Sequence, residues 1–328
     1  MNRIIASLFI TSILSFGSDT FPGIATGSTS GTYIRIGEDI ARICKESDSE
    51  DLKNINIIAS SGSFSNLKRL MSDKATHLAI IQHDVIGAAL NGMMGVETKK
   101  NAEKVRCLIP LYNEELHIIV NKNSNAIKKI EDLNGKTVGV GDKKSGTSFT
   151  CYMLEKELDL DWNGQNVGLR EGLDLLKRNE ISALFYVGGH PVPELEHEKN
   201  LKLLSLNSEQ RKNLHKTCGY SSSSIPPATY SFQTANINTI SPVSMLVSYN
   251  YKEHANNKDF QSKDQWVMDI TNTILENLDL MKTNTSGIYH DKWAQVLSDK
   301  SILSEDNDNS FIYYGNIKQK LIQYVNAQ

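Results

Sequence analysis

The chain has 328 residues, of which 39% are hydrophobic and 22% are charged. This length predicts about two domains, and the composition is that of an ordinary globular protein rather than of a disordered chain. A formal net charge of −3 without any long basic run argues against nucleic-acid binding, so no nucleic-acid partner is expected.

The first seventeen residues have the pattern of a secretory signal peptide. Arg3 precedes the apolar run Ile4–Phe16, and the small residues Ser15 and Gly17 stand at positions −3 and −1 of a cleavage after Gly17. An uncleaved anchor or a buried first strand is the alternative, but the run is shorter than the roughly 20 apolar residues of a membrane span. Removal of residues 1–17 and a periplasmic location are therefore predicted.

Beyond this segment, short apolar runs alternate with helical stripes. The runs that predict strands are Ile24–Ala25, Asn54–Ser60, Thr76–Asp84, Leu108–Asn123, Thr137–Val140, Ala183–Val187 and Val243–Val247. The stripes that predict helices contain Ile36, Ile40 and Ile43, then Phe64, Leu67 and Leu70, then Leu169, Leu173 and Leu176, and finally Val267, Ile270 and Ile274. Repeated strand–loop–helix units predict an α/β fold with parallel strands. Because no low-complexity linker separates the halves, we expect two α/β units that face each other across a cleft.

Three loops rich in glycine and hydroxyl residues each follow a predicted strand and open a predicted helix. They span Gly27–Tyr33, Ser60–Ser65 and Gly141–Ser148. The first turn of a helix has unpaired N–H groups and a partial positive charge, so such loops favour an anionic or zwitterionic small molecule. For any one loop alone, a capped helix with a glycine turn is the simpler explanation.

Motifs of catalysis and of cofactor binding are incomplete. The segment "GDKKSGTS" has Thr147 where a phosphate-binding loop needs lysine, and no GxGxxG opens a helix. The cluster of His190, Glu194 and His197 is interrupted by prolines, and the cysteines, Cys44, Cys107, Cys151 and Cys218, have long irregular spacings without CxxC. Neither a metal nor a cofactor is predicted, while disulfides and buried thiols both remain open. A binding protein rather than an enzyme is expected.

The segment "IATGSTSGTYIRIGEDIARI" is similar to the opening of the TAXI family, the solute-binding receptors of tripartite ATP-independent periplasmic (TRAP) transporters. The matching positions are Gly31, Thr32, Tyr33 and Gly37, then Gln82 and Asp84, and then the pattern DLxGKxVxVGxxxSGT over Asp132–Thr147. The resemblance extends over about residues 24–280, which is most of the chain.

This resemblance implies a type II periplasmic-binding-protein fold, with two α/β lobes around a ligand cleft. The first lobe would contain residues 18–114, the second lobe residues 115–229, and the return crossing, the completion of the first lobe and the C-terminal helices residues 230–328. The chain would be a monomeric receptor that captures a small carboxylate or amino acid, glutamate-like, and hands it to the membrane subunits of an ion-gradient-driven TRAP permease. A module that presents its solute to a sensor or signalling partner, or an exported enzyme on the same fold, is the alternative.

The ligand is expected to be held by neutral donors at helix N-termini and by their hydroxyl groups, with Gln82 at a strand end and His190 after the strand that ends at Val187. Arg35, Arg69 and Arg170 fall in or beside helical patterns and are expected at the surface. The expected ligand-binding residues are Ser28, Thr29, Ser30, Gly31, Thr32, Tyr33, Ser63, Gln82, Ser145, Gly146, Thr147 and His190. No catalytic residue is expected.

Overall fold

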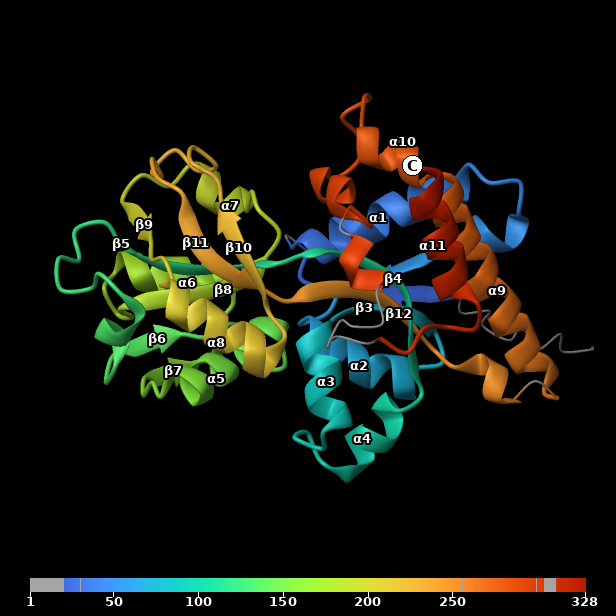
Figure 1. The fold of residues 1–328 in the computed structure, drawn as a ribbon, viewed down its shortest axis with the longest axis horizontal. Coiled ribbons are helices and arrows are strands. Elements are labelled where there is room, and N and C mark those ends of the chain that lie inside the picture. Colours follow the sequence, from blue (N-terminus) through green and yellow to red (C-terminus); the bar gives the residue numbers. More distant parts are fainter. Residues whose placement is uncertain (1–20, 30, 255, 299, 304–310) are drawn as a thin grey trace, which may run out of the picture.

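The computed structural model of the chain describes residues 21–29, 31–254, 256–298, 300–303 and 311–328. The predicted signal peptide, residues 1–17, and the candidate Ser30 lie outside these ranges. In the described part, the chain forms two lobes that lie side by side (Figure 1).

The first lobe is built on a five-stranded sheet with the order β2-β1-β3-β12-β4. Its strands are β1 (Gly23–Ala25), β2 (Asn56–Ile58), β3 (Thr76–Gln82), β4 (Val105–Asn113) and β12 (Val243–Tyr249). The strands β1, β2 and β3 are parallel, whereas β12 runs antiparallel to both β3 and β4. Strand β3 is buried along its whole length, as expected for a strand with helices on both faces of the sheet.

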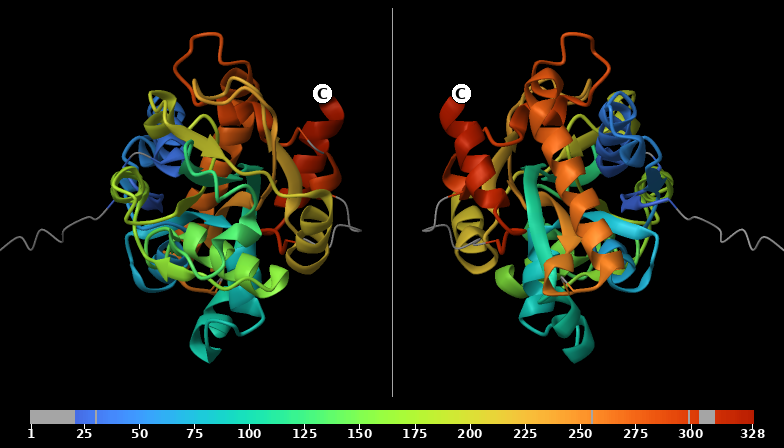
Figure 2. Two further views of the ribbon diagram at one scale, coloured as in Figure 1. Left: turned by 90° about the vertical axis from the view of Figure 1, so that its left-hand side faces the viewer. Right: turned by 90° about the vertical axis from the view of Figure 1, so that its right-hand side faces the viewer.

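Helices cover both faces of this sheet. They are α1 (Thr32–Lys45), α2 (Ser63–Ser72), α3 (His83–Leu90), α4 (Val96–Ala102), α9 (Lys258–Glu276), α10 (Leu278–Thr283) and α11 (Ile317–Ala327), with the 3-10 turns η1 (Glu50–Leu52), η3 (Tyr251–His254), η4 (Asp291–Gln295) and η5 (Lys300–Leu303). In the right-hand view of Figure 2, α9 and α11 lie on the outer end of this lobe. The isoleucine stripe of α1 is buried as predicted, because it packs on the sheet in one hydrophobic cluster with α9.

The second lobe repeats the arrangement with the strand order β7-β6-β8-β5-β9. Its strands are β5 (Glu115–Asn121), β6 (Thr137–Gly139), β7 (Asn163–Gln165), β8 (Ala183–Gly188) and β9 (Leu201–Leu203), and β10 (Ser221–Ile225) pairs with β11 (Ile237–Ser241) in a separate ribbon. Its helices are α5 (Gly146–Leu158), α6 (Leu169–Lys177), α7 (Pro193–Glu196) and α8 (Ser208–Cys218), with the 3-10 turn η2 (Ile130–Leu133).

In each sheet, the antiparallel strand is the first strand that the chain forms after it passes from the other lobe. Strand β4 leads into β5 across Glu114, and β11 leads into β12 across Pro242. Strand β12 lies between β3 and β4 in the first sheet, and β5 lies between β8 and β9 in the second sheet. Two lobes with this shared strand order and two crossings form the type II periplasmic-binding-protein fold, so the predicted fold class is confirmed.

One strand prediction is wrong. Residues Leu108–Asn123 were expected to form a single strand, but the structure divides them at Glu114 between β4 and β5, which belong to different sheets. Both halves are apolar and buried on both faces, so the hydrophobic pattern continues through the break.

Two further observations concern the membrane and the thiols. Among the described helices, none combines the length and the apolar character that a membrane crossing requires. All four cysteines are free, and burial raises the thiol pKa of Cys44 to about 12 and that of Cys218 to about 11. The open alternative of disulfides or free thiols is thus decided in favour of free thiols.

Candidate functional site

Four helix N-termini, two from each lobe, meet at one cavity of about 330 Å³ between the lobes. The residues that precede α1, α2, α5 and α6 are Gly31, Gly62, Ser145 and Gly168, and all four line the cavity. The helices follow strands β1, β2, β6 and β7, so the cavity lies at the carboxyl ends of parallel strands. The cavity is therefore surrounded by positive helix ends.

Side-chain caps are missing from three of these four helices. Ser145 Oγ accepts a hydrogen bond from Ser148 N at 3.1 Å, whereas the glycines before α1, α2 and α6 have no side chain with which to cap. First-turn N–H groups that no other group of the protein binds are available to a ligand. Gly62 also has a φ of +111°, a conformation that a residue with a side chain adopts only with strain.

A chain of buried polar side chains lies along the cavity. Tyr33 Oη donates to Glu114 Oε2 at 2.6 Å and lies 3.2 Å from Ser63 Oγ. The Ser63 hydroxyl in turn donates to Gln82 Oε1 at 3.3 Å. Gln82 is only 2% exposed, yet its Nε2 has no hydrogen-bond partner among the residues that the structure describes. A buried amide donor without a partner costs free energy, and the Gln82 Nε2 group is free to donate a hydrogen bond into the cavity.

Gln82 also brings the two lobes into contact. A Cβ atom added to Gly146, at the start of α5, would lie 1.2 Å from Gln82 Oε1. The side chain of Gln82 thus occupies the space that any other residue at position 146 would need. Next to it, Ser65 N of α2 donates to the Lys144 carbonyl of the second lobe at 3.3 Å. The structure is therefore a closed arrangement of the lobes.

Acidic side chains also line the cavity, among them Glu114 and Asp142. Glu114, in the crossing between β4 and β5, is 4% exposed, and burial raises the pKa of its carboxyl group to about 8. Burial likewise raises the pKa of Tyr33, so the phenol stays protonated and acts as the donor to Glu114. Near α6, a Cβ atom on Gly168 would lie 3.0 Å from Asp142 Oδ2, which places this carboxylate at a helix N-terminus.

The cavity rim contains one arginine. Arg170, in the first turn of α6, lines the cavity, but its side chain is 77% exposed and its Nε donates to Glu194 Oε1 at 3.2 Å. The arginine is therefore at the surface, as predicted, and also at the entrance of the site, which the sequence did not indicate.

Ten expected site residues come together at this cavity. They are Ser28, Thr29, Gly31, Thr32, Tyr33, Ser63, Gln82, Ser145, Gly146 and Thr147. The Thr147 hydroxyl oxygen accepts from Val187 N at 3.1 Å, which leaves its hydrogen for another acceptor. That these residues bind a ligand stays a prediction.

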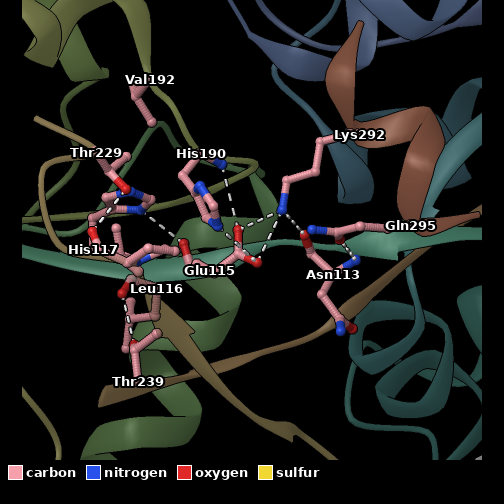
Figure 3. Close-up of polar contacts among 12 residues, drawn as sticks. Asn113, Glu115, Leu116, His117, His190, Val192, Thr229, Thr239, Lys292 and Gln295 are labelled. Carbon is pink, nitrogen blue, oxygen red and sulfur yellow. Dashed lines mark hydrogen bonds and ion pairs between the residues drawn. The ribbon is translucent and has the colours of Figure 1, made fainter. Parts of the chain in front are cut away.

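His190 does not line the cavity. It lies beside Glu115 and Lys292 at the crossing between the lobes, with its Nε2 3.8 Å from Glu115 Oε1 (Figure 3). Lys292 Nζ, from η4 of the first lobe, contacts both oxygens of Glu115 at 2.8 and 2.9 Å, and both side chains are 2% exposed. This cluster joins the lobes outside the cavity.

Sequence reasoning missed several lining residues, above all Glu114, Asp142, Phe185 and Tyr186. A signal for Glu114 was present, because two consecutive glutamates interrupt an otherwise apolar run at Asn113–Glu115. In the described part of the chain, no group of three potential metal ligands gathers in one place.

Comparison with known proteins adds a family and a fold. The sequence model of the NMT1-like family matches residues 24–302.

A solved structure from Bordetella bronchiseptica RB50 is 16% identical to this chain. It covers 93% of this chain and 81% of that chain, and it superposes with a TM-score of 0.51, which supports the fold. The substrate-binding protein of an amino acid ABC transporter gives a TM-score of 0.48 at 15% identity, covering 83% of this chain and 96% of that chain. The GluR0 ligand-binding core from Nostoc punctiforme, in complex with L-glutamate, gives 0.46 at 14%, covering 83% and 98%. Of these three structures, the one with the TM-score of 0.51 bears on the fold, and it bears on the fold alone.

Proposed function

The chain belongs to the NMT1-like family, and we propose that it is an exported solute receptor which captures a small carboxylate or amino acid between its lobes and delivers it to a membrane permease. The permease class that we propose is the ion-gradient-driven TRAP type, from the resemblance of the "GSTSGTY" and "DLNGKTVGVGDKKSGT" segments to the TAXI receptors. The periplasmic location rests on the signal-peptide pattern of residues 1–17.

The observation that carries this proposal is the meeting of four helix N-termini at one cavity, with the unpartnered Nε2 of Gln82. A helix N-terminus favours an anion by about 0.3–1 kcal/mol when exposed and by up to about 2 kcal/mol when partly buried. Each hydrogen bond to a charged group adds about 1.5–3 kcal/mol. Together, such contacts offset the cost of removing a carboxylate from water.

Delivery of a solute requires that the cavity can open. The lobes are joined by two crossings, at Glu114 and Pro242, and contact each other across the cavity through Gln82 and Gly146. We propose that these crossings act as the hinge about which the lobes close on the ligand. The expected division into residues 18–114, 115–229 and 230–328 stays a prediction. The second crossing, at Pro242, lies within the third of these segments rather than at residue 230, where that segment begins.

A thermal-shift panel tests the function. The purified protein is melted with each L-amino acid, with aliphatic mono- and dicarboxylates and with neutral sugars. A ligand present at 100 times its Kd stabilises the folded state by about 2.7 kcal/mol, so at least one acid should raise the melting temperature by several degrees. Stabilisation by sugars alone, or by no member of the panel, would contradict the proposal.

The variant Gln82→Met tests the mechanism of binding. Methionine fills a similar volume but cannot donate, so affinity for the acid identified by the panel should fall about 10-fold or more, as expected for one hydrogen bond to a charged group. The measurement is isothermal titration calorimetry. The melting temperature of the ligand-free variant is the control, and unchanged affinity would remove the amide from the site.

A further inference from the structure

We propose that the solute carries an ammonium group and that Glu114 is the residue that selects for it. This inference rests on the proposed function and narrows it, since it separates amino acids from carboxylates without an amine. The ligand class would be a small amino acid or another compact zwitterion.

Glu114 lies in the crossing between β4 and β5 and lines the cavity. Alternation along the extended chain sends neighbouring side chains in opposite directions, so Glu115 points to Lys292 whereas Glu114 faces the cavity. Its Oε2 accepts from Tyr33 Oη at 2.6 Å. Within the described residues, no other donor lies within hydrogen-bond distance of this carboxyl group, so its second oxygen is available to a ligand.

Glu114 forms no ion pair with a basic side chain of the described residues. Lys292, which acts on Glu114 electrostatically, is already bound to Glu115 and to the Asn113 carbonyl. Arg170 is paired with Glu194 at the exposed rim. A buried carboxylate without a cation is unfavourable, and buried charges in proteins are normally paired. The cavity therefore lacks one positive charge at this position.

The surroundings of Glu114 do not supply that charge. The ionisable groups that act on it from the neighbouring elements are Tyr33 of α1, Asp84 of α3, Tyr112 of β4, Glu115 of β5, Tyr186 of β8 and Lys292 of η4. Burial is the largest influence, and it raises the pKa of Glu114 to about 8, so near neutral pH the empty site holds a proton there. An ammonium group in contact with Glu114 would replace this proton.

The rest of the cavity lining favours the opposite charge. The N-termini of α1, α2 and α5 and the Gln82 amide favour an anionic group, and Glu114 favours a cationic one. A ligand with both groups satisfies both preferences, whereas a plain carboxylate leaves Glu114 protonated and without a cation. Together these groups favour a zwitterion.

The experiment compares matched pairs: each L-amino acid and the carboxylic acid that remains when its amine is replaced by hydrogen, such as L-glutamate and glutarate. The native protein should bind at least one amino acid about 10-fold or more tightly than its deaminated partner, and Glu114→Gln should abolish that preference. Glutamine retains an acceptor for Tyr33, so the fold should be kept. Glu155→Gln is the control, because Glu155 is a half-buried glutamate whose pKa is also raised by burial but which lies outside the cavity.

Proton release provides a second readout that needs no variant. The binding enthalpy of the amino acid is measured in buffers of different ionisation enthalpy. Near pH 7, binding should release close to one proton, and affinity should rise by about 10-fold per pH unit between pH 6 and the pKa of about 8.

The two proposals fail in distinguishable ways. If a deaminated acid binds as tightly as its amino acid, or if Glu114→Gln keeps the preference for the amino acid, this inference is overturned while the receptor function stands. If no compound of either series binds, both are overturned.

Discussion

Gly146 decides whether the Gln82 amide can lie between the two lobes. The glycine is the first residue of α5, where alanine would ordinarily be the better helix former. Any Cβ at this position would occupy the place of Gln82 Oε1, so absence of a side chain is what permits the close approach. The requirement comes from a residue 64 positions earlier in the sequence, on the other lobe.

We predict that Gly146→Ala weakens ligand binding at least about 10-fold, because the displaced amide can no longer donate from its buried position. Affinity is measured by calorimetry with the acid identified by the panel. Gly87→Ala is the matched control: Gly87 also lies within a helix, α3, but a Cβ added there would meet no neighbouring atom within 4 Å. The control should keep its affinity and gain about 0.5–1 kcal/mol of stability. Equal affinities for the two variants would contradict the role of Gly146.

At the scale of elements, the short turn η4 links the lobes. It carries Lys292 to the crossing between β4 and β5, where the ammonium group binds Glu115, 177 residues away in the sequence (Figure 3). Lys292 Nζ also donates to the carbonyl of Asn113, the last residue of β4, at 3.1 Å. The turn η4, near the C-terminus, is thus hydrogen-bonded to the residues at which the chain enters the second lobe.

We predict that Lys292→Met destabilises the protein by about 3–5 kcal/mol, the usual cost of leaving one member of a buried ion pair without its partner. The double variant Lys292→Met with Glu115→Gln should recover part of this loss, because no uncompensated charge then remains buried. Urea denaturation of the native protein and of the three variants completes the cycle. If the double variant is as unstable as the sum of the single variants, the pair is not coupled.

Across the whole molecule, a second buried contact joins the lobes. Asp84 Oδ2, on α3 of the first lobe, accepts from Thr150 Oγ1 at 3.1 Å and from Tyr220 Oη at 2.8 Å, both of the second lobe. Burial raises the pKa of Asp84, and the two hydroxyl donors act in the opposite direction. None of these three residues lines the cavity. The contact therefore stabilises the closed arrangement of the lobes and does not touch the ligand.

We predict that Tyr220→Phe lowers ligand affinity about 3- to 10-fold without touching the ligand, since removal of a hydrogen bond across the lobes disfavours the closed state. Tyr230→Phe is the matched control, because the Tyr230 hydroxyl bonds to His117 and Val192 of its own lobe. The control should lower the melting temperature and leave affinity unchanged. Loss of affinity in both variants, measured by calorimetry, would contradict a specific role in closure.

The sequence by itself determined the α/β class and the loops that open helices. The isoleucine stripe of α1 and the glycine- and serine-rich loops before α1, α2 and α5 are properties of neighbouring residues, so periodicity and composition reveal them. The residues expected at those loops, such as Tyr33 and Thr147, do meet at one cavity. Within each lobe the carboxyl ends of the parallel strands share one edge of the sheet, and the loops of both lobes line the same cavity.

Only the tertiary structure decided which groups complete the cavity. Glu114 was expected to end the first lobe, but the single strand expected over Leu108–Asn123 gave no sign that the Glu114 side chain lines the cavity. His190 was expected near the ligand, but the structure places it with Glu115 and Lys292, outside the cavity. The physical reason is the same in both cases: burial, pairing and the direction of a side chain depend on contacts between residues far apart in the chain, and local patterns carry no information about those contacts.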